Sequence, residues 1–210
     1  MGTKTKATVQ KGKKPTAKDS TVKKRRSPIT RAEGERRLIQ ATITLTRDTP
    51  FSDVGVREIA ALADVNHGFV HTWFGSKNDL LIRVVGQLLA EMVAKVETTE
   101  PGVQVLDPLN PDVRLAVRLL IWLELEGINS WSLLEKLPIV QALADRYVKV
   151  EGLTPKDAHA AAIQAVAVGI AASTFSQVLS QDSDGGTNDI VDVFVLWRHI
   201  LGLLAAHPRA

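Results

Sequence analysis

Residues 56–81 read VREIAALADVNHGFVHTWFGSKNDLL, and this stretch decides the fold that we predict. Apolar residues recur three and four positions apart over 56–63, the pattern stops at residues 64–66, and it resumes until Phe74. Such spacing is typical of amphipathic helices, and a polar interruption is typical of a turn. We therefore expect two short helices, the second starting near Asn66, joined by a tight turn. These are the dimensions of a helix-turn-helix that reads DNA.

Helical spacing continues on both sides of this unit. Thr30 precedes Glu33 by three positions at the start of one predicted helix, and Ser76 precedes Asp79 in the same way at the start of another. This is the capping-box spacing, in which a hydroxyl and a carboxylate satisfy free amides of the first turn. The helix that begins after Ser76 should extend to about residue 99.

The carboxyl-terminal half is also predicted to be helical. A linker with several prolines over 101–111 cannot be a helix interior, and Asp112 is expected to cap the apolar helix that follows. The remaining helices are expected over 112–129, 131–152 with a break or kink at Pro138, 154–180 and 189–206. Because strand-like alternation is scarce, we predict an all-α protein of about nine helices.

The composition excludes several classes of protein. There are no cysteines, which excludes disulfides, thiolate metal sites and thiol nucleophiles. The five histidines have no metal-ligand spacing, and neither a phosphate-binding glycine loop nor a Ser-His-Asp arrangement is recognisable, so we expect no enzyme, metal or cofactor. Polar residues interrupt every apolar stretch before it reaches roughly 18 residues, and no secretory segment opens the chain. We expect a cytoplasmic protein without a membrane span.

Basic residues concentrate at the amino terminus. Residues 1–28 contain ten Lys and Arg against Asp19 alone, a net charge of +9, whereas the rest of the chain has a net charge of −6. Because this segment contains few apolar residues, we expect residues 1–27 to form a disordered basic tail. Two interpretations remain open: the tail binds DNA phosphates with release of counterions, or it only keeps the protein soluble.

The quoted stretch resembles the signature of the tetracycline-repressor (TetR) family of bacterial transcriptional regulators. In that family an Ile-Ala pair, an Ala-Gly-Val turn, a recognition helix ending in Phe and a Ser-Lys step recur at the spacing seen between Ile59 and Lys77. The specific likeness covers residues 30–82. It implies a DNA-binding domain over 28–77 and an α-helical regulatory and dimerisation domain over 78–210. It also implies a packing set inside this DNA-binding domain, which we call the head: Ile59, Ala60, Ala63, Val65, Val70 and Phe74.

The resemblance further implies which residues face DNA. The second short helix should enter the major groove, and the lysine at the start of the next helix should contact a phosphate. The predicted DNA-binding residues are Arg31, Gly55, Asn66, His67, Gly68, Phe69, His71, Thr72, Trp73 and Lys77. Alternatives remain for four of them: Phe69 and Trp73 as packing residues of the head, and His67 and Arg31 as solvated side chains.

Three positions depart from the family's pattern. Asp64 replaces the turn glycine, and we expect it to adopt the left-handed conformation that glycine would supply. Gly55 replaces a hydroxyl residue that caps the helix and reaches phosphate, so one backbone contact should be missing. His71 replaces a tyrosine that contacts phosphate; an imidazole can still donate, more strongly when protonated. These changes should alter the operator sequence or affinity without abolishing DNA binding.

The likeness assigns roles to the rest of the chain as well. It implies that the last two helices pair with their mates across a two-fold axis, whereas the alternative is burial in a monomer. The predicted interface residues are Val168, Ala171, Phe175, Phe194, Trp197 and Leu201. The middle helices are the family's usual place for a small molecule, and the predicted pocket residues are Trp122, Trp131 and Tyr147. If these aromatic residues are not simply core, the effector should be hydrophobic.

The sequence therefore predicts a ligand-responsive transcriptional regulator, most simply a repressor. It should bind a palindromic operator as a homodimer and be released by a hydrophobic small molecule. One alternative is a module of the same fold that binds a ligand or a protein and has weakened or lost sequence-specific DNA recognition. Another is unspecific coating of nucleic acid by the tail, which removal of the tail would abolish.

Overall fold

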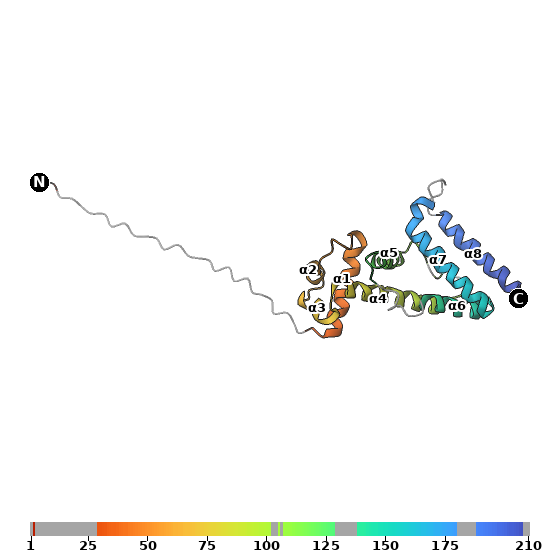
Figure 1. Ribbon diagram of the computed structural model, residues 1–210, viewed down its shortest axis with the longest axis horizontal. Coiled ribbons are helices and arrows are strands. Elements are labelled where there is room, and N and C mark those ends of the chain that lie inside the picture. Colours follow the sequence, from red (N-terminus) through yellow and green to blue (C-terminus); the bar gives the residue numbers. More distant parts are fainter. Residues whose placement is uncertain are drawn as a thin grey trace.

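Eight α-helices make up the part of the chain that the structure, a computed structural model, describes (Figure 1). The described residues are 2, 29–101, 105, 107–128, 138–179 and 188–207, and they contain no strand. The helices are α1 (Arg31–Asp48), α2 (Val56–Leu62), α3 (Gly68–Phe74), α4 (Lys77–Thr98), α5 (Pro111–Leu125), α6 (Pro138–Glu151), α7 (Pro155–Leu179) and α8 (Asn188–Ala206). The all-α prediction is confirmed. The ninth helix, expected before Pro138, and the basic tail fall outside the described residues.

The predicted caps explain where three of the helices, α1, α4 and α7, begin. Thr30 accepts a hydrogen bond from the Glu33 amide at 3.3 Å, and Ser76 accepts one from the Asp79 amide at 3.1 Å. Thr154 does the same for α7, from the amide of residue 157 at 3.2 Å. These hydroxyls satisfy first-turn amides that have no partner inside the helix.

One predicted helix cap was wrong. Asp112 does not cap α5; Asn110 does, and its side-chain oxygen accepts from the amides of residues 112 and 113 while Pro111 occupies the first helical position. Helix α3 begins at Gly68, close to the predicted start near Asn66, and the Asn66 side-chain oxygen accepts the Gly68 amide at 2.9 Å.

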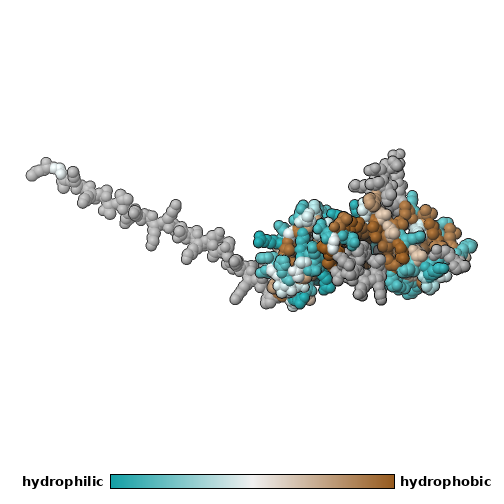
Figure 2. All heavy atoms as spheres, viewed as in Figure 1, coloured by the Kyte–Doolittle hydropathy of each residue, from teal (hydrophilic) through white to brown (hydrophobic). Residues whose placement is uncertain are grey.

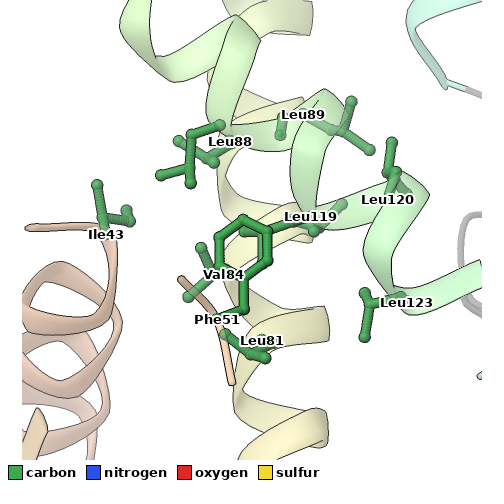
Figure 3. Packing of buried hydrophobic residues seen from close by; sticks show 12 residues of the cluster. Ile43, Phe51, Leu81, Val84, Leu88, Leu89, Leu119, Leu120 and Leu123 are labelled. Atoms are coloured by element: carbon green, nitrogen blue, oxygen red, sulfur yellow. The ribbon is translucent and has the colours of Figure 1, made fainter. Parts of the chain in front are cut away.

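Three apolar clusters hold the helices together. The head, formed by α1, α2 and α3, has its own cluster, which is completed by Leu80 of α4. A second cluster joins α4 to α5 and takes in Phe51 from the loop between α1 and α2 (Figure 3). The third cluster joins the end of α4 to α6, α7 and α8. The core is therefore continuous from the head to the opposite end of the molecule.

Helix α4 connects the two ends of the molecule (Figure 1). Its first turns pack on α1 and α3, and its last turns pack on α6. At 1.5 Å per residue its 22 residues span about 33 Å. Arg146 of α6 fixes the far end, because its guanidinium donates to the carbonyls of Val96 at 3.2 Å, Thr99 at 2.6 Å and Glu100 at 2.9 Å. A cation on these terminal carbonyls also suits the helix dipole.

Helices α7 and α8 pack against each other and expose much apolar surface (Figures 1 and 2). Residues 155–175 of α7 are long and apolar enough to cross a membrane, although only 28% of the tested window is buried in the single chain. One such helix is weak evidence for a membrane span, because a core helix meets the same criteria. Gln164 interrupts the apolar residues of this stretch, as expected, but its mean hydropathy still makes it a weak candidate.

Candidate nucleic-acid interface

Helices α2 and α3 are held by the packing set that the sequence predicted. Ile59 and Val70 are fully buried, and Ala60, Ala63 and Val65 are nearly so. The sixth member, Phe74, is partly buried against the same cluster. One side of each short helix is thereby fixed to α1 and α4, and the opposite side of α3 is left to solvent. The predicted packing set is confirmed.

Asp64 makes the turn between α2 and α3. Its φ of 53° is the only positive value among the described residues other than glycine. The left-handed conformation closes the turn, and the Val65 amide donates to the Ala60 carbonyl at 3.0 Å. The prediction that aspartate takes over the conformation of a glycine is confirmed.

Helix α3 presents polar side chains and one aromatic ring on its outer side. On α3 and the turn before it, the exposed residues among those predicted to face DNA are Asn66, His67, Phe69, His71 and Thr72. The Thr72 hydroxyl donates to the Gly68 carbonyl of its own helix at 3.0 Å. These five exposed residues, three on α3 and two directly before it, form a surface that can enter a groove of DNA.

His71 is oriented by the end of its own helix. Its Nδ1 lies 3.2 Å from the Gly75 carbonyl oxygen. Because a carbonyl only accepts, Nδ1 must carry the proton, and Nε2 is directed away from this bond. A neutral imidazole therefore offers an acceptor at Nε2, and only the protonated ring can donate to a phosphate from that atom.

Trp73 is held between α1 and Phe69. A methyl group on Gly34 of α1 would overlap the Trp73 ring atoms Cη2 and Cζ3, so the indole lies directly on that glycine. On α3 itself the Phe69 and Trp73 rings stack, with centroids 4.3 Å apart and planes 4° from parallel. This geometry favours the packing interpretation for Trp73, whereas Phe69 remains exposed on the outer side.

Two predicted phosphate contacts have partners within the chain. Lys77 donates from Nζ to the carbonyl of Phe51 at 2.5 Å. Partial burial lowers the pKa of Lys77, an effect that the nearby carboxylates of Asp53 and Glu58 oppose. Arg31 donates from Nε to a Glu35 carboxylate oxygen at 2.6 Å. Both cations would have to share or exchange these partners to contact a phosphate.

Gly55 begins α2 without a side-chain hydrogen bond at its cap. The Glu58 carboxylate lies over this position, where a side chain on residue 55 would meet it. The absence of a capping hydroxyl agrees with the expected loss of one contact.

Phe51 and its partners on α5 form a joint between the head and α5, which no local sequence pattern predicts. Phe51 is 6% exposed, its ring meets Trp122 edge to face at 5.8 Å between centroids, and the Arg118 guanidinium lies 5.2 Å above it. Arg118 also donates to the Arg47 carbonyl at 3.2 Å, and Arg47 pairs with Asp112 at 2.6 Å. No local pattern indicates these contacts, because the partners lie far apart in the sequence.

The predicted pocket residues do not come together. Trp122 packs on Phe51 in the central cluster, Tyr147 is buried in the third cluster, and Trp131 lies outside the described residues. Burial raises the pKa of the Tyr147 phenol, whose oxygen accepts from the Trp197 indole at 3.5 Å. The larger cavity described, about 410 Å³, lies between the end of α4 and α6 with charged residues in its lining, and neither Trp122 nor Tyr147 lines it.

The predicted interface residues divide into two groups. Phe175 and Ala171 of α7 are exposed, and Val168 is partly exposed. Leu201, in contrast, is 3% exposed inside the single chain, and Trp197 packs on the third cluster and bonds Tyr147. Leu201 therefore serves the core of its own chain, which corrects its predicted place at the interface. The Phe194 side chain lies outside what the structure describes.

Comparisons with known proteins agree with this arrangement. Residues 38–84 match the family model described as bacterial regulatory proteins, tetR family. The chain is similar to the HTH-type transcriptional repressor Rv3405c of Mycobacterium tuberculosis and the HTH-type transcriptional regulator Mb3439c of Mycobacterium bovis, each 29% identical over 145 residues, 67% of this chain and 75% of the relative. A solved TetR-family transcriptional regulator from Streptomyces coelicolor shares the fold, with a TM-score of 0.52 and 20% identity over 81% of this chain and 98% of that one.

Proposed function

Because residues 38–84 match the model of the TetR family of bacterial regulatory proteins, we propose that this chain is a member of that family and a repressor that binds a palindromic operator as a homodimer. Residues 28–77 are the DNA-binding part, and residues 78–210 provide dimerisation and regulation. The observation that carries the proposal is α3 itself, which is anchored by the fully buried Val70 and exposes His71 and Thr72 beside it. The chain acts on DNA in the cytoplasm as a binding protein, not as an enzyme.

Electrostatics support a role for the amino-terminal tail in this binding. Residues 28–77 contain six basic and six acidic side chains, so the head attracts DNA weakly. Three of its arginines, at positions 31, 36 and 37, are also paired with glutamates on α1. The net charge of +9 in residues 1–28 can supply the missing attraction by binding neighbouring phosphates.

The test is selection of bound duplexes from a random double-stranded library at physiological salt. The wild type should recover an inverted repeat whose half-sites lie about one helical turn apart. A His71→Ala/Thr72→Ala variant should lose that enrichment. Thr44→Ala is the matched control, because Thr44 is also exposed and its hydroxyl donates to the carbonyl four residues earlier at 3.0 Å.

Two other outcomes would contradict the proposal. Equal recovery of all sequences by the wild type and the double variant would mean that the tail alone attracts DNA. No recovery by either protein would favour a module that binds a ligand or another protein.

The apolar surface of α7 and α8 supports a homodimer. Six large apolar side chains on these helices are about half exposed in the single chain: Ile163, Phe175, Val193, Val195, Leu196 and Leu203. An apolar surface of this kind usually marks an interface with another protein (Figure 2). A second copy of the chain would cover it and place two heads for two half-sites.

Release by a hydrophobic small molecule is the regulatory part of the proposal. The Tyr147 phenol is a polar group in an otherwise apolar cluster of α4, α6, α7 and α8, as in many ligand sites. A ligand that moves α6 would also move the end of α4 through Arg146, and α4 carries the head at its other end. Such a ligand must bind the released state more tightly than the DNA-bound state.

A further inference from the structure

Two aromatic side chains stack on α3, and the head holds this stack in place. Binding to the DNA backbone alone would not require an aromatic ring to be held in this way. Phe69 stacks on Trp73 with ring planes 4° from parallel, and Trp73 lies on Gly34, where no side chain intervenes. Trp73 is partly buried against the head, whereas 37% of Phe69 is exposed. One face of the Phe69 ring is therefore covered by Trp73, and the ring is presented to solvent in a fixed position.

The groups beside Phe69 have partners within α3. The Thr72 hydroxyl donates to the Gly68 carbonyl at 3.0 Å, and the Asn66 side-chain oxygen accepts the Gly68 amide at 2.9 Å. Neither group needs DNA to satisfy these atoms. The apolar group that α3 exposes among these residues is the Phe69 ring, and a partner of this ring must gain from apolar contact.

In the major groove, one base offers such a contact. Guanine, adenine and cytosine present hydrogen-bond donors and acceptors, whereas thymine adds a methyl group at C5. A phenyl ring placed against a polar base edge would displace water without replacing its hydrogen bonds, which is unfavourable. Placed against the methyl group, the same ring buries apolar surface on both sides.

We propose that Phe69 recognises a thymine methyl group in each operator half-site, and that Trp73 and Gly34 are positioning residues for its ring. The inference rests on the proposed function, since it needs a preferred DNA sequence, and it adds a base and a chemical group to that function. Trp73 acts through Phe69 and does not itself contact the base.

The experiment replaces single thymines of the selected operator by deoxyuridine, which removes only the methyl group. At one thymine per half-site the wild type should lose affinity about fourfold, as burial of one such group implies. Phe69→Ala should bind the thymine and deoxyuridine duplexes equally well. In the converse experiment, cytosine replaces the same thymine, and 5-methylcytosine then replaces the cytosine. The added methyl group should raise the affinity of the wild type by about the same factor and leave the affinity of Phe69→Ala unchanged.

Two further variants separate positioning from general damage. Trp73→Ala keeps Phe69 but removes its support, so the ratio between thymine and deoxyuridine should fall toward one. Leu62→Ala removes another exposed apolar side chain of the head, 52% exposed on α2, and should keep the fourfold ratio. If Trp73→Ala does not fold, the comparison of the wild type with Phe69→Ala still tests the proposal, because Phe69 is exposed.

The results distinguish this inference from the proposed function. A preferred operator without any thymine whose methyl group matters would overturn the inference alone, as would an unchanged ratio in Phe69→Ala. A wild type without any preferred sequence would overturn the proposed function and the inference with it.

Discussion

At the scale of single residues, Asp64 shows how a turn can keep its shape without glycine. Its φ of 53° lies in the region that aspartate visits more readily than most residues other than glycine. The turn sets the angle between α2 and α3, so the conformation of this one residue positions the outer side of α3.

We expect Asp64→Gly to be more stable than Asp64→Ala by about 1 kcal/mol. Both variants remove the carboxylate and whatever it contacts, so their difference isolates the strain of a left-handed alanine. Urea unfolding of the two proteins measures it. Equal stability would show that the turn tolerates any residue.

Single-residue roles were predictable only where the partner is close in the sequence. The conformation of Asp64 and the burial of Val70 follow from a local pattern. The hydrogen bond between Lys77 and the Phe51 carbonyl joins residues 26 positions apart, and the packing of Trp73 on Gly34 joins α3 to α1. A small residue on α1 was a signal for the second contact, but spacing alone could not indicate its partner.

At the scale of elements, the start of α1 carries a compact charge cluster. Glu33 accepts from Arg36 at 2.8 Å and from Arg37 at 2.7 Å, and these bonds lower the pKa of the Glu33 carboxyl from 4.5 to about 2. A carboxyl whose pKa is lower in the folded chain than in the unfolded chain stabilises the fold when it is ionised.

Stability relative to Glu33→Gln should therefore depend on pH. The advantage of the wild type should be complete above about pH 4.5 and should disappear as the pH falls toward 2, the two pKa values of this carboxyl. Because the side chains are exposed, the effect should be small. Thermal unfolding of both proteins across this range measures it, and a difference independent of pH would contradict the assignment.

The loop between α1 and α2 is the element whose loss should matter most. Phe51→Ala should destabilise the protein by about 3 to 5 kcal/mol, because it leaves a cavity between α4, α5 and Trp122 (Figure 3). Phe69→Ala is the control, since it removes the same side chain from an exposed position and should cost far less. Chemical unfolding compares them, and similar losses would argue against the joint.

Elements were more predictable than their contacts. Capping residues fixed the starts of α1, α4 and α7 because a cap and its amide lie three residues apart. Asp112 is also a residue type that caps helices, but Asn110 caps α5, because Pro111 is suited to the first helical position. The packing of α5 on the head could not be inferred from periodicity. Periodicity indicates that one face of a helix is buried, but it does not indicate which element covers that face.

At the scale of the whole molecule, the exposed side of α7 and α8 is the proposed dimer interface. Phe175→Glu should shift the protein from dimer to monomer, because it places a charge where the partner would cover an apolar ring. Leu125→Glu is the matched control, since Leu125 is 81% exposed on α5, outside that surface. Sedimentation at several concentrations distinguishes them, and an unchanged dimer in both would place the interface elsewhere.

Removal of residues 1–27 should weaken DNA binding without changing the preferred operator. Each tail cation that neutralises a phosphate should add about 0.9 to the slope of the logarithm of affinity against the logarithm of salt concentration. The truncated protein should therefore have the smaller slope. An identical slope would mean that the tail only aids solubility, and a lost preference would mean that it reads bases.

The Phe51 joint finally limits how this protein can be divided and reused. A hybrid regulator made by transplanting residues 29–76 onto a foreign sensor domain would carry an aromatic side chain without its Trp122 and Arg118 partners. The transplanted segment would have to include α5, or the foreign domain would have to provide side chains that pack around Phe51 in the same way. The natural unit for engineering is thus the head together with α4 and α5, and not the helix-turn-helix alone.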